Sequence, residues 1–453
     1  MQPFKFFVIT DTHYFAKSLS AKGKPYEEFM DFEQKCFAET PYINDAVFDY
    51  LAKQTQTDTI LIAGDLSFNG EKASHEEFVQ LLNKLKDAGK DVYVVTAGHD
   101  MEQNPFEYTE EGRQTVEGVG FFDLYDYYKN FGYDKAISFY RENLSYVAQL
   151  TEGLRLLVLC NDSEERKNIA YTDELLAWAK EQMDKAKTDG QMMIAMEHYP
   201  VLPGQPVLTL IPDARQKESK KLYTLLADNG VHLIFTGHMH NQSINSVTTE
   251  NGNIFYDVCT GSAIGCPAFM RLVTVEDDSA VDIKSIPVPD FEWDTNGKDC
   301  TEYMRDQFER MIRVLITGMK TDPGRILRKL NIKDNPKIYP IVRKIGGALS
   351  EWTVGRIAKL LLVKCDKEIK NVKFIDLAVD IVRYMFEGDQ PFVEGTPTGD
   401  TVLRVFRRLR PLWSILNKKM KGSQGEQLDF YDMLKNTLGN YSVSDYNAVL
   451  KLK

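Results

Sequence analysis

The sequence predicts an α/β domain followed by a helical region. Over the first half, short apolar runs alternate with amphipathic helical stretches, as in FKFFVIT (4–10), TILIA (59–63) and VYVVT (92–96). Apolar runs that stop at turn residues are typical of strands buried on both faces of a parallel sheet. From about residue 291 onward, apolar residues recur at three- and four-residue spacing, which indicates helices.

The predicted elements follow a β-α-β order, for which right-handed crossovers are expected. A strand at 4–10 precedes a helix near 44–53, a strand at 59–63, a helix at 71–88 and a strand at 92–96. The same order continues through 154–160, 172–187, 192–196, 217–228 and 231–235. Alternating stretches at 254–258, 271–275 and 281–286 then predict antiparallel strands. Helical stripes follow around 303–315, 352–364, 374–386, 402–416 and 443–452.

Length and charge both predict two domains, residues 1–290 and residues 291–453. A chain of 453 residues exceeds the usual size of one domain. From residue 291 onward, 29 Lys and Arg oppose 21 Asp and Glu, a net charge of +8, whereas the part before it has 26 against 45, a net charge of −19. We expect the two parts to attract each other, and the acidic part is unlike a general nucleic-acid binder.

Other features of composition predict a cytoplasmic protein without a membrane span. No apolar run approaches the roughly 20 residues that cross a bilayer. The six cysteines are scattered without a CxxC pair, which argues against a disulfide scaffold and a cysteine zinc site. The first strand starts without a charged leader.

Histidines and aspartates gather at the ends of the predicted strands. Histidine is scarce, with seven in the chain, and five of them follow a strand directly. A single histidine there is more often structural, but five at one edge of one sheet favour a site. The mixed oxygen and imidazole donors suit Zn, Mn or Fe. The candidates are Asp11, His13, Asp65, His99, His198, His238 and His240.

Spacing supports a metal site. In Asp11-x-His13 and His238-x-His240, residues two apart on an extended backbone point the same way, so both members of a pair are expected to face one ion. Asp65, between these pairs in the sequence, is placed to bridge two ions about 4 Å apart.

These motifs resemble the calcineurin-like metallophosphoesterases. Asp-x-His, GDLSFNG (64–70), a Gly-His-Asp element (98–100), a lone strand-end histidine and Gly-His-x-His occur in that family's order over residues 4–290. The segment GDLSFNGEKASH and the later Asn104-Pro105 resemble a bacterial branch of the family near the class III cyclic-nucleotide phosphodiesterases. The resemblance implies a four-layer α/β/β/α sandwich, here with a C-terminal helical domain, and a two-metal centre between the sheets.

The resemblance also implies roles for the candidate residues. Asp11, His13, Asp65 and His240 would hold one divalent ion, and Asp65, His198 and His238 the other. His99 would contact the phosphate and assist the leaving oxygen. A water between the two ions, with a pKa lowered toward about 7, would attack phosphorus in line.

One position departs from the family. The family motif is Gly-Asn-His-Asp, and its asparagine binds the second ion. This chain has Gly98 at the position of that asparagine. Loss of one neutral ligand costs on the order of 10–100-fold in affinity. Asn69 and Asn161 are candidate replacements. We therefore expect a second site that is weakened.

Two functions follow as hypotheses. The first is a metal-dependent phosphoesterase that hydrolyses a small phosphodiester, such as a cyclic nucleotide, or a phosphomonoester. The second is a nucleotide- or protein-binding regulator on the same fold, with its second metal site degraded at Gly98. A basic stretch within 404–421 predicts a solvated or domain-docking face more than a surface for nucleic acid or acidic lipid.

Overall fold

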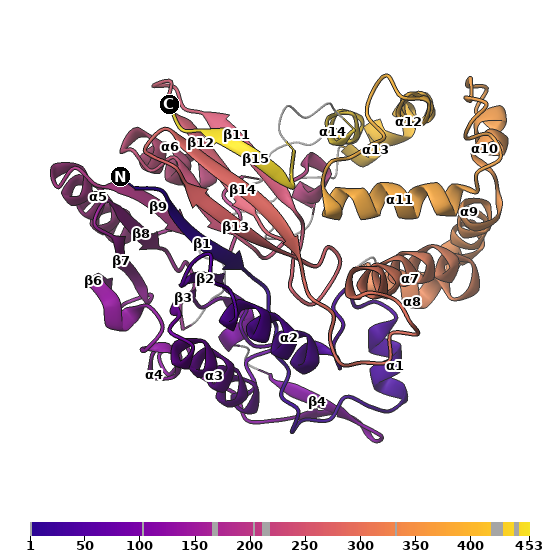
Figure 1. Cartoon of the computed structure of the whole chain (residues 1–453). Coiled ribbons are helices and arrows are strands. Elements are labelled where there is room, and N and C mark those ends of the chain that lie inside the picture. The colour runs from indigo at the N-terminus through magenta and orange to yellow at the C-terminus, as the bar shows by residue number, and fades with distance from the viewer. Residues whose placement is uncertain are drawn as a thin grey trace.

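The computed structural model describes residues 2–101, 104–164, 171–202, 204–210, 218–330, 333–417, 429–438 and 444–453. Two mixed sheets face each other, and helices cover their outer faces (Figure 1). In order across the first sheet, the strands are β15 (Asn447–Lys451), β14 (Ala280–Pro287), β13 (Phe269–Val275), β1 (Phe4–Ile9), β2 (Thr59–Ala63) and β3 (Asp91–Val95).

The second sheet has seven strands and supplies the other half of the core. In order they are β11 (Ser243–Thr248), β12 (Ile254–Cys259), β10 (Leu233–Thr236), β9 (Met192–Met196), β8 (Leu154–Val158), β7 (Ser145–Thr151) and β6 (Ala136–Tyr140). Phe6 and Phe235 meet edge to face across the two sheets, with ring centroids 5.4 Å apart. A separate hairpin pairs β4 (Phe106–Thr109) with β5 (Gly112–Thr115).

Helices form the two outer layers. On the first sheet, α2 (Thr40–Ala52) and α3 (Lys72–Asp87) bury Val47, Phe48 and Phe78. On the second sheet, α5 (Asp173–Thr188) and α6 (Ser219–Asp228) bury Ala179 and Leu226. The short helix α1 (Lys24–Met30) packs against the β4–β5 hairpin, and α4 (Leu124–Tyr128) packs against α3. The expected four-layer α/β/β/α sandwich is confirmed.

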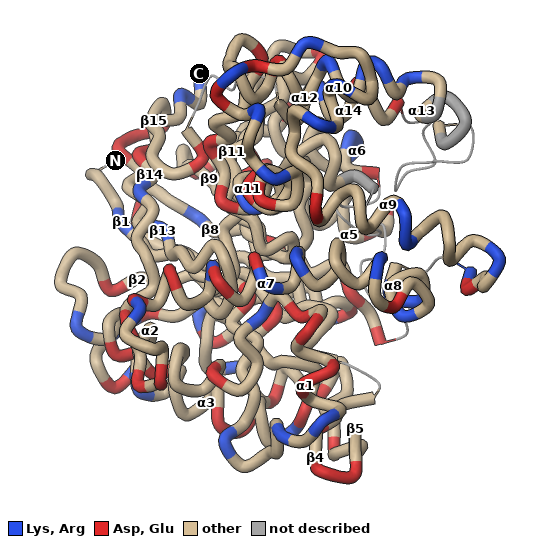
Figure 2. Tube along the Cα trace, turned by 90° about the vertical axis from the view of Figure 1, so that its right-hand side faces the viewer, with Lys and Arg blue, Asp and Glu red and all other residues tan. Residues whose placement is uncertain are grey.

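The helical region follows the last long strand. Its helices are α7 (Cys300–Thr321), α8 (Pro323–Lys329), α9 (Tyr339–Glu351), α10 (Val354–Leu360), α11 (Phe374–Glu387), α12 (Pro397–Arg408), α13 (Arg410–Asn417) and α14 (Phe430–Thr437). Acidic and basic residues lie on both parts where α7 and α8 meet α1 (Figure 2). Asp31, in the acidic part, forms ion pairs with two arginines of the basic part, Arg310 at 3.3 Å and Arg325 at 3.0 Å. These pairs agree with the attraction expected from the opposite net charges.

Two sequence expectations are wrong. Within the stretch 443–452, the described residues 444–452 are not helical, because β15 pairs antiparallel with β14 and returns the chain to the first sheet. The buried guanidinium of Arg271 helps to hold this segment by donating to the carbonyl of Asp445 at 3.0 Å. The stretch 254–258 is not purely antiparallel, since β12 runs parallel to β10 and antiparallel to β11.

The basic stretch of the helical region makes internal contacts. Arg404 pairs with Asp400 at 3.0 Å, and Nε of Arg407 donates to the hydroxyl of Tyr431 at 3.1 Å. Lys418, Lys419 and Lys421 lie outside the described residues. Both contacts lie within the helical region, so a face that docks onto the acidic part stays a prediction. Among the described residues, no helix combines the length and apolarity needed to cross a membrane.

Candidate metal centre

The candidate residues meet at one rim of the molecule because their strands end there. Asp11 and His13 follow β1, Asp65 follows β2 and His99 follows β3. In the facing sheet, His198 follows β9, while His238 and His240 follow β10. Five parallel strands, β1, β2, β3, β9 and β10, therefore deliver side chains into the space between the sheets.

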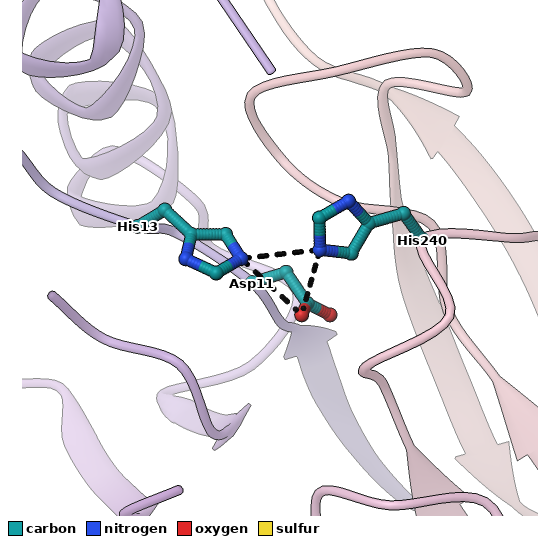
Figure 3. A group of neighbouring side chains, drawn as sticks. All are labelled: Asp11, His13 and His240. Carbon is teal, nitrogen blue, oxygen red and sulfur yellow. Dashed lines mark hydrogen bonds and ion pairs between the residues drawn. The ribbon is translucent and has the colours of Figure 1, made fainter. Parts of the chain in front are cut away.

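The first group of donors is Asp11, His13 and His240 (Figure 3). The Nε2 atoms of the two histidines lie 3.1 Å apart. Oδ1 of Asp11 lies 3.2 Å from Nε2 of His240 and 3.6 Å from Nε2 of His13. Three donor atoms thus face one point in a site where Asp11 and His13 are fully buried.

The second group is Asp65, His198 and His238. Oδ2 of Asp65 lies 3.0 Å from Nε2 of His198 and 3.6 Å from Nε2 of His13. Asp65 therefore stands between the two groups. His198 donates from Nδ1 to the carbonyl of Ala63 at 2.8 Å, which fixes the tautomer whose Nε2 carries the lone pair.

The backbone at these residues is in the left-handed region. The φ angles are +51° at Asp11, +36° at His13, +51° at Asp65, +66° at His238 and +51° at His240. Such conformations are strained for residues other than glycine and cluster at functional sites. The expectation of an extended backbone is wrong. His238 and His240 belong to different groups. This grouping agrees with the roles that the family resemblance implied and not with the shared ion that their spacing favoured.

Two glycines allow the close approach of the strand ends. A Cβ at Gly64 would lie 2.5 Å from Nδ1 of His198. A Cβ at Gly237 would lie 1.9 Å from Oγ1 of Thr10 and 2.5 Å from Oδ2 of Asp11. The glycine before Asp65 and the glycine before His238 are thus required by packing against the opposite side of the site.

Electrostatics in the site favour a bound cation. Burial lowers the pKa of His198, but the charges of Asp65 and Asp11 outweigh it and raise this pKa to about 10. Burial, and then the charge of Lys35, hold the pKa of His13 well below its usual range. Burial, and then the charge of His198, lower the pKa of His238 to about 3. Two buried carboxylates beside imidazoles, of which those of His13 and His238 are held neutral, are a donor set that fits divalent Mn, Fe or Zn.

His99 lies close enough to His13 and Asp65 to form a third group of candidate donors with them. Its ring centroid is 4.7 Å from that of His13, and its backbone N–H donates to Oδ1 of Asp65 at 3.1 Å. Nδ1 donates to the carbonyl of Phe68 at 2.7 Å, which orients the ring. Gly98 precedes it in a short 3-10 turn, Gly98–Met101.

The proposed substitutes for the missing asparagine lie near this turn. Asn161 is buried just beyond β8, the neighbour of β9. Asn69 is buried too, and its Nδ2 donates to the carbonyl of Asn104 at 3.3 Å. Their role as ligands stays a prediction.

Two buried aspartates that sequence reasoning left without a role support the site. Asp100 accepts from the backbone N–H groups of Ser67 and Ala97, both at 2.8 Å, and so joins the loops after β2 and β3. Asp257 accepts from the N–H groups of Val201 and Leu202 and fixes the loop after His198. A charged residue inside the apolar stretch IFYDVC was the available signal for Asp257.

The other two histidines, His75 and His232, lie outside the site and form hydrogen bonds that indicate structural roles. His75 is fully buried in α3, where its Nδ1 meets the hydroxyl of Tyr128 at 2.6 Å and its Nε2 meets the carbonyl of Asp100 at 3.0 Å. His232 contacts the carbonyl of Ile254 through Nδ1 at 2.7 Å. Both fit the structural roles expected for them.

Solved structures with a similar fold include three hydrolases. A dimetal phosphatase from Danio rerio is 12% identical with a TM-score of 0.46, and the match covers 63% of this chain and 96% of that one. A purple acid phosphatase from yellow lupin (Lupinus luteus) seeds is 12% identical with a TM-score of 0.40, covering 66% and 53%. A 5'-nucleotidase precursor from Thermus thermophilus is 13% identical with a TM-score of 0.35, covering 63% and 54%.

This chain therefore spans only about half the length of the latter two proteins. At such identities and scores, these likenesses carry no argument about activity. No curated protein sequence matches the chain. A sequence model described as calcineurin-like phosphoesterase matches residues 4–242, which is more than half of the chain and includes every strand end described above. The chain belongs to the calcineurin-like phosphoesterase family.

Proposed function

We propose that this protein is a metal-dependent hydrolase of small phosphate esters. The observation that carries the proposal is the position of Asp65, whose carboxylate lies between two groups of buried donors that come from opposite sheets. Asp11, His13, Asp65 and His240 would hold one divalent ion, and Asp65, His198 and His238 a second. When bound, the ions supply Lewis acidity that lowers the pKa of a water and offsets charge on the phosphate.

The chain's own residues would orient the reaction. The hydrogen bond from Nδ1 of His99 to Phe68 and the bond from its backbone N–H to Asp65 hold the ring beside both donor groups. Nε2 of His99 would then donate a proton to the leaving oxygen. Asp100 and Asp257 would keep the loops of both sheets in register during the reaction.

Phosphodiesters such as cyclic nucleotides are the substrates we expect first, with phosphomonoesters as the alternative. This choice rests on the sequence resemblance of GDLSFNGEKASH to the branch near the class III cyclic-nucleotide phosphodiesterases. Cytoplasmic location belongs to the same proposal and is supported by six free cysteines.

The test is hydrolysis of bis(p-nitrophenyl) phosphate by the full chain with Mn²⁺, Fe²⁺ or Zn²⁺ added, compared with His99→Ala. Loss of a general acid is expected to lower kcat by about 10²–10⁴-fold. Metal content, measured by mass spectrometry of the ions, should be equal in the two proteins because His99 is not a proposed ligand. Equal inactivity of both proteins with every metal would reject the enzyme hypothesis.

Gly98 favours a second candidate function. Since glycine offers no ligand, a protein with one ion would bind a nucleotide or a protein without turning it over. Equilibrium dialysis that finds one manganese per chain, together with nucleotide binding and no hydrolysis, would support this regulator.

A further inference from the structure

Lys35 is a lysine whose side chain is largely shielded from water while its ammonium keeps room for a ligand. Its side chain is 9% exposed. Nζ forms an ion pair with Oε1 of Glu33 at 3.9 Å, which is beyond hydrogen-bond distance. Among the described residues no atom accepts a hydrogen bond from Nζ, and Nζ is not one of the buried polar atoms without a partner, so it is in contact with solvent. An ammonium carries three donors, which leaves this one able to bind an anionic ligand.

The ammonium lies beside the candidate metal centre. Nζ of Lys35 stands 4.6 Å from the centroid of the Phe68 ring. That ring centroid is 6.0 Å from the centroid of His13, and the carbonyl of Phe68 accepts the hydrogen bond from His99. One aromatic residue therefore contacts Lys35, a proposed metal ligand and the proposed proton donor.

The segment that carries Lys35 is held from two directions. On one side, the N–H of Cys36 donates to the carbonyl of Ile264 at 2.9 Å. That stretch also contains Ser262, whose hydroxyl donates to the carbonyl of Asp11 at 2.9 Å. The segment is thus tied to the same backbone that supports the end of β1.

On the other side, helix α7 of the C-terminal region holds the residues before and after Lys35. Nε2 of Gln307 donates to the carbonyls of Met30 and Glu33, at 3.2 and 3.1 Å. The hydroxyl of Tyr303 donates to Oε1 of Glu39 at 2.6 Å. Because the backbone on both sides of Lys35 is held in place, less conformational entropy is lost when its side chain binds a ligand.

We propose that the ammonium of Lys35 binds an anionic oxygen of the substrate phosphate and, by strengthening the binding of doubly charged phosphomonoesters more than that of singly charged phosphodiesters, extends the site to the alternative substrate class named above. The proposal rests on the proposed function. The physical reason is that attraction grows with the charge of the phosphate, and screening by salt is weak where both charges are shielded from water.

The experiment compares the wild-type full chain with Lys35→Met, Lys35→Gln and Lys35→Arg, all loaded with Mn²⁺. The kcat/KM is measured for p-nitrophenyl phosphate and for bis(p-nitrophenyl) phosphate, and the Kd for inorganic phosphate by calorimetry. Loss of a charged hydrogen bond should lower kcat/KM for the monoester, and raise the Kd for phosphate, by about 10–100-fold. The diester should lose several-fold less, and Lys35→Arg should retain most of both activities.

Lys90→Met is the matched control. Lys90 is equally buried, but its Nζ donates to the carbonyls of Gln54 and Thr57 and to Oδ1 of Asp58, at the opposite end of β3 from His99. We expect Lys90→Met to lower the Tm and leave the Kd for phosphate unchanged. Lys35→Met and Lys35→Gln should change the Tm less than Lys90→Met does, because they remove one long ion pair and one contact with the Phe68 ring and no hydrogen bond.

The outcomes separate this proposal from the proposed function. Equal Kd for phosphate and equal kcat/KM ratios in wild type and both neutral variants would overturn the role of Lys35. A loss of manganese in those variants would overturn it too, since the effect would then arise from the ions. If wild type hydrolyses neither ester but binds phosphate through Lys35, the proposed function fails and the binding group stands.

Discussion

Oδ2 of Asp65 lies 3.0 Å from Nε2 of His198 and 3.6 Å from Nε2 of His13, although these histidines belong to different sheets and different donor groups. Asp65 is 2% exposed and sits in the left-handed region with φ of +51°. A strained, buried carboxylate that faces donors on both sides is suited to share its oxygens between two cations. Its removal should therefore have a different effect from the loss of a ligand on one side.

Asp65→Asn is expected to lower the affinity for both ions, whereas His238→Ala is expected to lower the affinity for only one. The reason is that His238 groups with Asp65 and His198 alone. Inductively coupled plasma mass spectrometry after dialysis against limiting Mn²⁺ measures the stoichiometry. We expect two ions in wild type, one in His238→Ala and fewer than one in Asp65→Asn.

Thermal unfolding gives an independent check of this prediction. An ion present at 100 times its Kd stabilises the fold by about 2.7 kcal/mol through mass action, so excess Mn²⁺ should raise the Tm of wild type above its value in EDTA. The rise should be smaller in His238→Ala and absent in Asp65→Asn. An equal rise in all three proteins would mean that manganese binds elsewhere.

Gly98→Asn is expected to strengthen the second metal site. Gly98 is followed by His99, whose N–H donates to Asp65, and it is not among the glycines with positive φ, so its backbone conformation suits a larger residue. A restored amide oxygen should raise the affinity for the second ion on the order of 10–100-fold. Calorimetric titration with Mn²⁺ would detect this as a steeper second transition.

The control for Gly98→Asn is Gly98→Ala, which adds a Cβ without a ligand atom. It should leave the second affinity at the wild-type value. If alanine and asparagine give equal affinities, the ligand at this position is not missing, and a buried amide such as Asn161 already replaces it.

The strand-end residues could be predicted because they follow from simple periodicity. The apolar run 59–63 stops at Gly64-Asp65, and the carboxyl ends of neighbouring parallel strands must share an edge. The backbone conformations that bring these residues together could not be predicted from the sequence. Positive φ angles at Asp11 and His240 depend on packing from the opposite sheet, including the contact of Gly237 with Thr10.

The strand β15 and the burial of Lys35 also lay beyond the sequence pattern. Five residues, NAVLK, are too few to separate a strand from a helical turn, and the partner of β15 is β14, more than 150 positions earlier. Lys35 lies over the ring of Phe68, and α7 holds the neighbouring Glu33 through Gln307, and no local periodicity reports these contacts.

Met385→Ala is expected to lower both stability and metal affinity. Met385 of α11 packs with Met239, the residue between His238 and His240, and the carbonyl of the next residue, Phe386, accepts from the N–H of Gln242 at 2.7 Å. Truncation of a buried methionine costs about 2–5 kcal/mol in the free energy of unfolding. The cavity would also loosen the loop that carries the two histidines.

The matched control is Met183→Ala. Met183 is buried in α5 on the outer face of the second sheet, in a cluster that contains none of the site residues. Urea unfolding in EDTA should show a similar loss of stability in both variants, and calorimetry with Mn²⁺ should show weaker binding only in Met385→Ala. Equal metal affinities would show that the helical region does not position the loop.

The last prediction concerns pH and the buried His75. Burial lowers the pKa of His75 to about 4 and outweighs the hydrogen bond to the carbonyl of Asp100, which raises it. An unfolded histidine titrates near 6.5, so between about pH 6.5 and pH 4 the unfolded chain binds more protons than the folded chain. The contribution of His75 to stability is therefore fully present above about pH 6.5 and declines as the pH falls, by about 3 kcal/mol at pH 4. His75→Gln keeps polar atoms without this titration, so the difference in unfolding free energy between wild type and variant, measured with urea in EDTA, should shift in favour of the variant by that amount between pH 7 and pH 4. A difference that stays constant over this range would contradict the buried neutral ring.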